Sequence, residues 1–352
     1  MKYLELNTDE AKGLFTQTAR VYEEESQLTD FWFRRMLRPE FSFDGTFQAV
    51  SGTNSRVMAD IISTQSSLPI KSRGAIKAYS GKIPKMGLKY VLDEDDITML
   101  DGFSQVPGME NQVIQKIYND VNECIMGIER TNEYNLLSLL SGEAFLAKDD
   151  TLMSENQAVR VSYDINETDS GLDFDTATAA QLRKAINGAI KESKKKKRAR
   201  YVLMSDNTFD ALAASKLADE VYAQVIRVKD APSPTPEQFK DAFKAVFGVE
   251  IEVIDTILEQ ENVEGVKTEV KPFKDNVMTF VPSLDLGRLV WAKTGEHNIK
   301  YQSKCAVYAN VNTYTLVSQH SEIEPLEFYT RGQARALPVL DEIENMYFLK
   351  FK

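Results

Sequence analysis

One long amphipathic helix constrains this chain more than any other feature of its sequence. From Glu110 to about Ser141 there is no proline, and the apolar residues fall mainly three or four positions apart, which places them on one stripe of a helix. At about 1.5 Å per residue such a helix is a rod of roughly 48 Å, which is long for a globular protein. A rod of this length is a poor feature for a compact monomer. Its stripe contains Val113, Ile114, Ile117, Val121, Ile125, Ile128, Leu136, Leu137 and Leu140.

The segment before this helix is a second non-compact feature. Residues 48–92 show little helical periodicity, and glycines and prolines divide them into short β-type runs rich in serine and lysine. About forty residues of this kind are unusual inside a compact domain unless they are functional or project from it. We therefore predict a long β-hairpin arm over 48–92.

The remaining sequence predicts a mixture of helices and strands. A helix is expected over residues 8–27, strand-like alternation occurs over 159–165, and strands predominate from residue 277 onward. Between these regions helices and strands alternate in an α/β pattern. Within that pattern, Asp206 is expected to cap a helix that begins near Phe209.

A second helix start in this region has a stronger signal. Thr235 is in the cap position, Pro236 in the first helical position, and Gln238 completes a capping box. The preceding proline-rich run predicts a stiff surface connector.

Length and composition indicate an ordinary globular protein. A chain of 352 residues predicts two domains, or one domain with long extensions. Apolar residues make up 43% and charged residues 27%, and no run of about 18 apolar residues predicts a membrane span. The start of the chain lacks the apolar core of a signal peptide, and the two cysteines, Cys124 and Cys305, fit a reducing compartment as small buried apolar residues. We therefore expect residence in a cytoplasm.

Charge is distributed unevenly along the chain. The net charge of −11 disfavours binding of nucleic acid through its phosphates. Residues 56–89 nevertheless hold seven basic residues and one acid, so this segment carries +6 and the rest of the chain −17. An acidic run, residues 93–96, follows directly.

The sequence contains no set of residues that is typical of catalysis. The two histidines, His297 and His320, belong to no zinc-ligand cluster, and no Gly-x-Ser-x-Gly elbow would supply a nucleophile. The stretch Gly74–Lys82 differs from a phosphate loop, because six residues separate its glycines and Ile83 replaces the magnesium-binding hydroxyl residue. We therefore predict no catalytic, cofactor-binding or metal-binding residues.

Two charged runs have structural interpretations that we prefer to functional ones. The acidic run 93–96 contains ligands for a hard cation, but acids at a helix start also cap its free amides and favour its dipole. The basic run Lys191–Arg200 has the charge of a nucleic-acid patch, but it also fits the last turn of a helix, where cations meet free carbonyls. No aromatic residues are interleaved with it for base stacking.

The order of the expected elements resembles that of a known fold. A helical N-terminal arm, a long β-type extension, one long helix and an α/β region that closes with strands follow one another. Short sequences along the chain add to this order: Leu68–Ile70, Gly81–Pro84, Glu129–Glu133, Leu139–Gly142, Val159–Asp164, Tyr201–Asp206, Phe209–Leu212, Val249–Val253, Phe280–Pro282, Leu286–Arg288, Trp291 and Arg335–Val339. Together they resemble, over about residues 56–352, the lambda-type major capsid protein E family of tailed bacteriophages, which has the Hong Kong 97-like fold.

This resemblance implies an α+β capsid fold with an N-terminal arm, an extended β-hairpin loop, a long spine helix, a peripheral domain and an α/β axial domain. The implied boundaries are 1–47 for the N-terminal arm, 48–92 for the extended loop, 93–175 for the peripheral domain with its spine helix at about 110–141, 176–310 for the axial domain, and 311–352 for closing strands shared by both domains.

The resemblance also implies a function. It implies a structural major capsid protein of a phage or prophage, without catalysis or cofactor. Copies of the chain would form pentamers and hexamers of an icosahedral virion shell around double-stranded DNA, without sequence-specific DNA contact and without a membrane. Assembly would take place in the bacterial host cytoplasm, with scaffolding, portal and decoration proteins as further partners.

In the resembled fold the extended loop lies across the adjacent subunit. Because the arm is basic and the rest of the chain acidic, we predict electrostatic docking of the arm on a neighbouring copy. The predicted intersubunit contacts are the basic Arg56, Lys71, Arg73, Lys77, Lys82 and Lys85 and the acidic Asp93, Glu94, Asp95 and Asp96.

Three alternatives stay open at the level of sequence. An encapsulin-like compartment shell has the same fold and encloses protein cargo. An α/β nucleotide-binding enzyme would use residues 176–260, although no glycine-rich loop is present. A nucleic-acid-binding protein would use Lys191–Arg200, which the net charge of −11 opposes.

Overall fold

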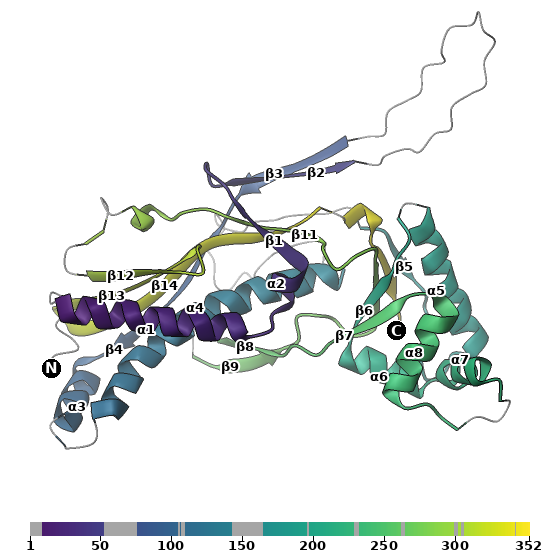
Figure 1. Ribbon diagram of the computed structural model, residues 1–352, viewed down its shortest axis with the longest axis horizontal. Coiled ribbons are helices and arrows are strands. Elements are labelled where there is room, and N and C mark those ends of the chain that lie inside the picture. Colours follow the sequence, from purple (N-terminus) through teal and green to yellow (C-terminus); the bar gives the residue numbers. More distant parts are fainter. Residues whose placement is uncertain are drawn as a thin grey trace, which may run out of the picture.

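The molecule is elongated, and one long helix runs along much of it. The computed structural model of the chain describes residues 9–52, 76–104, 106, 110–142, 165–195, 197–228, 232–261, 265–298, 302–303, 306–341 and 343–352. Four helices gather at one end of the molecule, and a two-stranded hairpin projects from one long side (Figure 1).

The long helix is present as predicted. Helix α4 (Glu110–Leu140) has 31 residues. Its apolar stripe is buried wherever its side chains are described: Val121, Ile125, Ile128, Leu136 and Leu137 are each at most 1% exposed. The side chain of Ile117 lies outside the described residues.

The larger sheet packs against α4 and is organised by one long strand. Strand β14 pairs along one edge with β13, and along its other edge first with β4 and then with β11. Strand β12 extends the sheet beyond β13, and β1 forms its opposite edge beyond β11. The six strands are β1 (Leu37–Phe41), β4 (Lys85–Leu92), β11 (Gly287–Trp291), β12 (Ala306–Val311), β13 (Thr315–Ile323) and β14 (Leu326–Leu340).

A second sheet lies among the gathered helices. Its order is β5-β15-β10-β6-β7, and helices α5 to α8 surround it (Figure 1). The strands are β5 (Glu167–Asp169), β6 (Tyr201–Ser205), β7 (Glu250–Ile254), β10 (Val277–Val281) and β15 (Tyr347–Lys350). The helices are α5 (Ala179–Lys194), α6 (Asp206–Ala214), α7 (Lys216–Ile226) and α8 (Pro236–Phe247).

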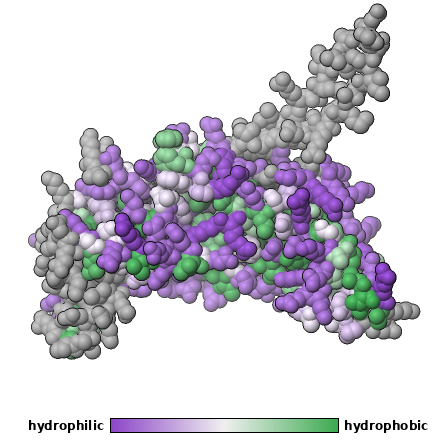
Figure 2. Space-filling model, in the orientation of Figure 1, coloured by the Kyte–Doolittle hydropathy of each residue, from purple (hydrophilic) through white to green (hydrophobic). Residues whose placement is uncertain are grey.

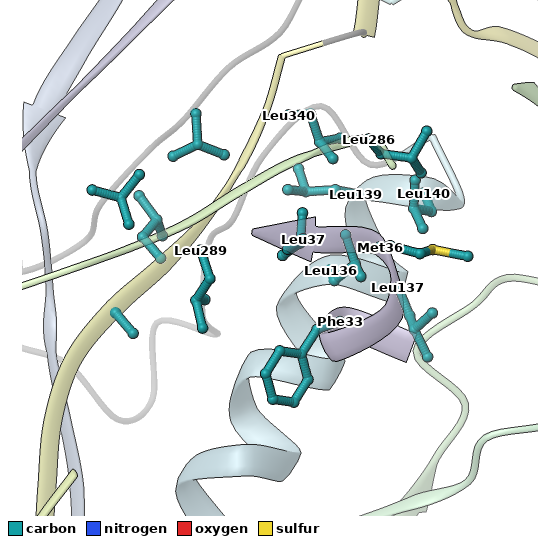
Figure 3. Close-up of a cluster of buried hydrophobic side chains, with 14 of the residues drawn as sticks. Phe33, Met36, Leu37, Leu136, Leu137, Leu139, Leu140, Leu286, Leu289 and Leu340 are labelled. Carbon is teal, nitrogen blue, oxygen red and sulfur yellow. The ribbon is translucent and has the colours of Figure 1, made fainter. Parts of the chain in front are cut away.

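Three groups of buried apolar side chains form the core. The first joins the C-terminal half of α4 to α2 (Trp32–Met36), β1, β11 and β14 (Figure 3). The second fills the space between α5–α8 and the second sheet. The third joins the middle of α4 to α1 (Asp9–Leu28), β12 and β13, and includes Phe15 and Val121. Helix α4 therefore contributes to two of the three groups, as expected of a spine.

Several local predictions are confirmed by the structure. Helix α1 (Asp9–Leu28) matches the helix expected over 8–27. Thr235 caps α8 through a complete capping box with Gln238, and Pro236 is the first residue of that helix. Cys124 is fully buried, and this burial raises the pKa of its thiol to about 12.

The hairpin prediction needs a correction. Strand β2 (Thr46–Gly52) pairs with β3 (Ile76–Lys82), so a hairpin is present, but its pairing begins at residue 46 and ends at residue 82. Residues 85–92 are not part of the arm: they form β4 and pair with β14 in the larger sheet. The prediction was wrong here because residues 85–92 pair with β14, a strand more than two hundred residues away, and no local pattern in the sequence indicates such a pairing.

Two further expectations differ from the structure. The cap of α6 is Ser205, whose hydroxyl accepts from the amide of Thr208, and Asp206 is already the first helical residue. Strands β11 and β12, which lie inside the expected axial range 176–310, belong to the larger sheet. The strand expected over 159–165 lies almost entirely outside the described residues.

Helix α3, a small hairpin and single-turn helices lie outside the two sheets. Helix α3 (Glu94–Ser104) follows β4, and strands β8 (Leu258–Glu261) and β9 (Lys267–Val270) form a separate small hairpin. Two single-turn helices span Gly295–His297 and Ile343–Asn345. Within the described ranges, none of the helices combines the length and the apolar character that a membrane-spanning segment requires.

Candidate intersubunit surface

The end of the β2–β3 hairpin that joins the body, at Thr46 and Lys82, is called its foot here, and it contains the predicted contact residues that the structure describes best. Arg56, Lys71 and Arg73 lie outside the described residues, and of Lys77 only the backbone, on β3, is described. Lys82 at the end of β3 and Lys85 at the start of β4 are both exposed. The structure thus places the two described members of the basic set together where the arm joins the body.

A tight turn sets the direction in which the arm leaves the body. The carboxylate of Asp44 accepts from the amide of Thr46 at 3.0 Å, the hydroxyl of Thr46 at 2.7 Å and the hydroxyl of Ser42 at 2.9 Å. These hydrogen bonds, first those of Thr46, lower the pKa of Asp44 to about 2. Gly45 adopts a φ of +71°, a left-handed conformation that glycine takes without strain.

An arginine joins the arm to the larger sheet. On β11, Arg288 donates from Nη1 to the carboxylate of Glu40 at 2.8 Å and from Nε to that of Asp341 at 2.9 Å. Its Nη2 donates to Asp341 at 2.8 Å and to the carbonyl of Gln48 on β2 at 3.2 Å. The two carboxylates raise the pKa of Arg288, chiefly through the hydrogen bonds of Asp341. One planar guanidinium therefore ties β1, β2, β11 and the end of β14 together.

Close packing supports the same junction. Phe47 on β2 is 3% exposed and lies in the first core group. A Cβ at Gly81, opposite on β3, would come within 2.9 Å of the Phe47 ring, so this position of the arm requires glycine. The arm is thus rooted in the core at its foot.

The acidic run lies at the far end of β4 from the basic residues. Asp93 caps α3, since its carboxylate accepts from the amide of Asp96 at 2.9 Å, and Glu94, Asp95 and Asp96 form the first turn of the helix. Asp93 is eight positions after Lys85, the first residue of β4, which at the rise of a strand is about 26 Å. The structure therefore confirms the helix-cap interpretation and does not bring the basic and acidic residues together within one copy.

The remaining sequence-level candidates occupy structural positions. Lys191 and Lys194 lie in the last turn of α5, and Lys195 follows as its cap and pairs with Glu192 at 2.6 Å. His297 bonds to the cap residue Thr294, and His320 stacks on Tyr329 with ring centroids 4.9 Å apart.

A buried polar network attaches the N-terminal segment to the spine helix. Glu129 on α4 is fully buried and accepts from Arg34 at 2.8 Å, Tyr314 at 2.8 Å and Asn312 at 3.0 Å. Burial raises the pKa of Glu129, and Arg34 opposes this effect. The network connects α2, α4 and the turn between β12 and β13.

A second buried carboxylate caps a helix from a distance. Glu133, one turn further along α4, accepts from the amides of Trp32 at 3.1 Å and Phe33 at 3.0 Å. These are the first two amides of α2, whose own cap residue, Phe31, supplies no side-chain acceptor. Burial raises the pKa of Glu133 to about 7 in spite of these two hydrogen bonds.

This raised pKa predicts a pH-dependent stability. Because the pKa is higher in the folded chain than its ordinary value of 4.5, the folded state favours the protonated form, and stability falls as pH rises from about 4.5 to about 7. The loss is about 3 kcal/mol for this shift. We expect Glu133→Gln to remove that part of the pH dependence, measured by denaturant unfolding of unassembled subunits across this range. Equal pH profiles for Glu133→Gln, the wild type and the exposed control Glu24→Gln would contradict the assignment.

Sequence reasoning missed the residues that organise the arm. Arg288 appears in the sequence only as part of a short family-like stretch, and its partners Glu40 and Asp341 are 248 and 53 residues away. Asp44 had a weak local signal, a short acidic residue before a glycine in a turn.

Comparison with known proteins identifies a family for this chain. The model of the family described as phage major capsid protein E matches residues 20–351. Among solved structures, the chain is similar to a protein assigned as the capsid protein of a prophage of Escherichia coli CFT073, with a TM-score of 0.54 and 12% identity over 96% of this chain and 99% of that one. No curated protein matches the chain.

Two further structures show weaker likeness. They are the capsid of Myoviridae phage XM1, with a TM-score of 0.46 and 11% identity over 90% of this chain and 89% of that one, and a phage-related protein of Bordetella bronchiseptica RB50, with a TM-score of 0.48 and 10% identity over 94% and 96%. Of these three structures, the prophage protein has the TM-score that supports a common fold, and it confirms the fold class expected from the sequence.

Proposed function

Because this chain belongs to the phage major capsid protein E family, we propose that its copies assemble into pentamers and hexamers that close an icosahedral shell around double-stranded DNA. The protein is a structural capsid protein. The observation that carries the proposal is the family match over nearly the whole chain, which favours a phage capsid over an encapsulin-like compartment or an α/β enzyme.

The shape of the subunit supports assembly. An isolated two-stranded hairpin is at best marginally stable in water, and both strands of the β2–β3 arm pair only with each other in the described part of the chain. Contact with another copy would supply the missing support and bury area that the monomer leaves exposed.

We assign the parts of the subunit accordingly. The larger sheet and α4 correspond to the peripheral domain, and the second sheet with α5–α8 corresponds to the axial domain. Membership of the family supports four further parts of the proposal. The subunit works without catalysis or cofactor, assembles in the host cytoplasm, contacts packaged DNA without reading its sequence, and meets scaffolding, portal and decoration proteins.

The basic arm is proposed to dock on an acidic surface of a neighbouring copy. Without the two lysines that belong to β4, the arm segment 46–82 carries +4 and the rest of the chain −15, so the arm of one copy and the body of the next attract each other. Lys89 is not expected to contact a neighbouring copy, because it lies on β4 and its Nζ is 4.1 Å from the centroid of the Tyr329 ring. The acidic start of α3 lies too far from the foot of the arm to neutralise it within one copy, which supports a contact between copies.

Removing the arm's charge should slow assembly. We expect the quadruple variant with glutamine at Lys71, Arg73, Lys77 and Lys82 to assemble more slowly than the wild type and to respond less to salt. Each exposed pair contributes only about 0.2–1 kcal/mol, so orientation and rate change more than final stability. Light scattering from 0.05 to 1 M salt measures both effects, since the Debye length falls to about 3 Å at 1 M.

A matched control removes the same charge elsewhere. Glutamine at Lys191, Lys194, Lys195 and Lys197, around the end of α5, should leave the assembly rate closer to that of the wild type. Assembly of the arm variant at the wild-type rate, with the wild-type salt response, would rule out electrostatic docking.

The proposed function itself is tested by the oligomeric state. Negative-stain microscopy and light scattering of the chain, produced together with the other head proteins of its phage, should show closed shells. Uniform small monomers under these conditions would overturn the proposal.

A further inference from the structure

The turn between β1 and β2 presents an aromatic side chain to solvent. Phe43 is 95% exposed, more than any other large apolar side chain in the described part of the chain. Figure 2 shows a protruding apolar patch with hydrophilic atoms around it, close to the place where Figure 1 shows this turn. Burial of a large aromatic side chain against a partner is favourable.

The backbone on both sides of Phe43 is fixed. The hydroxyl of Ser42 shares its one proton between the carbonyl of Thr46 at 2.6 Å and the carboxylate of Asp44, and the amide of Ser42 donates to the carbonyl of Trp291 at 2.7 Å. Asp44 holds Thr46 as described above, and the carbonyl of Gly45 accepts from the amide of Ile83 at 2.9 Å. The turn is therefore ordered before any partner arrives, which lowers the entropic cost of burying the ring on binding.

The ring itself is supported from behind. Phe43 packs edge-on against Phe41 with centroids 4.8 Å apart, and Phe41 packs against Trp291 at 4.6 Å. This aromatic row runs from β11 through the edge strand β1 and ends in solvent at Phe43. Rigid aromatic side chains of this kind carry much of the affinity at protein–protein interfaces.

We propose that Phe43 is an apolar anchor that packs into a second copy of this chain when the shell assembles. The proposal rests on the proposed function and adds a specific contact to it. Strand β2 begins three residues after Phe43, so the anchor is continuous with the arm that is proposed to lie on a neighbouring copy. Strand β1, which carries Phe41, is an edge strand of the larger sheet, and its outer edge pairs with no other strand in the part of the chain that the structure describes.

Site-specific photo-crosslinking identifies the occupant directly. Phe43 is replaced by p-benzoylphenylalanine, and the variant is assembled with isotope-labelled wild-type copies and irradiated. We expect cross-links between labelled and unlabelled copies in shells and none in unassembled subunits. Cross-links only within one chain, only to a different protein, or none in shells would each overturn the proposal.

Substitution measures the contribution of the anchor. We expect Phe43→Ser to raise the subunit concentration needed for assembly at least tenfold, whereas Phe43→Leu, which keeps an apolar group, should raise it less. The melting temperature of the unassembled subunit should stay unchanged, because the ring is 95% exposed. Wild-type behaviour of Phe43→Ser would overturn the anchor while leaving the proposed function intact. A wild-type chain that forms only monomers would overturn both.

Discussion

Val121→Asp should lower the free energy of unfolding by more than about 3 kcal/mol, since it buries an unpaired carboxylate among apolar side chains. Val121 is fully buried on α4 and packs in the third core group with Phe15 and Ile125. This position gives a sharper test of the spine stripe than Ile117, whose side chain is not among those described. Thermal or denaturant unfolding of the unassembled subunit measures the effect.

Asn119→Asp is the matched control for this substitution. It introduces the same acidic side chain on the same helix, two residues earlier, at an exposed position. It should change stability by less than about 0.5 kcal/mol. Near-normal stability of Val121→Asp would mean that the stripe faces solvent and that the register of α4 is wrong.

Arg34→Ala should cost about 3 kcal/mol, because it leaves Glu129 buried without its cation. Arg34 pairs with Glu129 at 2.8 Å, and the Glu129 side chain is 0% exposed. Tyr314 and Asn312 would still donate to the carboxylate, and Glu129 would take up a proton more readily, which limits the loss. The cost should therefore be larger at pH 8 than at pH 5 in denaturant unfolding of the subunit.

The neighbouring arginine provides the control. Arg35 and its partner Asp30 are 48% and 76% exposed and 3.4 Å apart, so Arg35→Ala should cost less than about 1 kcal/mol. Equal effects of Arg34→Ala and Arg35→Ala would show that the buried network does not attach the N-terminal segment to the spine.

Local signals in the sequence predicted the elements that local physics determines. Helix α4 follows from the spacing of its apolar residues, and the start of α8 from a cap, a proline and a glutamine within four positions. The hairpin nature of the arm follows from its turn residues and its lack of helical periodicity. In each case the residues that determine the structure are neighbours in the chain.

Contacts between distant residues could not be predicted in the same way. The sequence predicted that residues 85–92 continue the arm, but in the structure they form β4 and pair with β14 in the larger sheet. The amides of α2 are capped by Glu133, about one hundred residues away, and Arg288 meets its partners only after folding. Buried carboxylates on an otherwise apolar stripe were a signal that could have been read, because such groups are rarely buried without partners.

Some of the candidate contact residues could be predicted from the sequence and others could not. Charge along the sequence was enough to predict a basic arm and an acidic run, and the structure places the described members at opposite ends of β4. Nothing in the sequence singled out Phe43, because exposure is a property of the folded chain.

Electron cryomicroscopy of the assembled particle would show directly whether this chain is a shell subunit whose arm engages a neighbouring copy. We expect a closed icosahedral shell of pentamers and hexamers, with the β2–β3 arm of each copy lying across the adjacent copy and Phe43 buried between them. Particles in which every arm folds back on its own subunit and Phe43 faces solvent would contradict it.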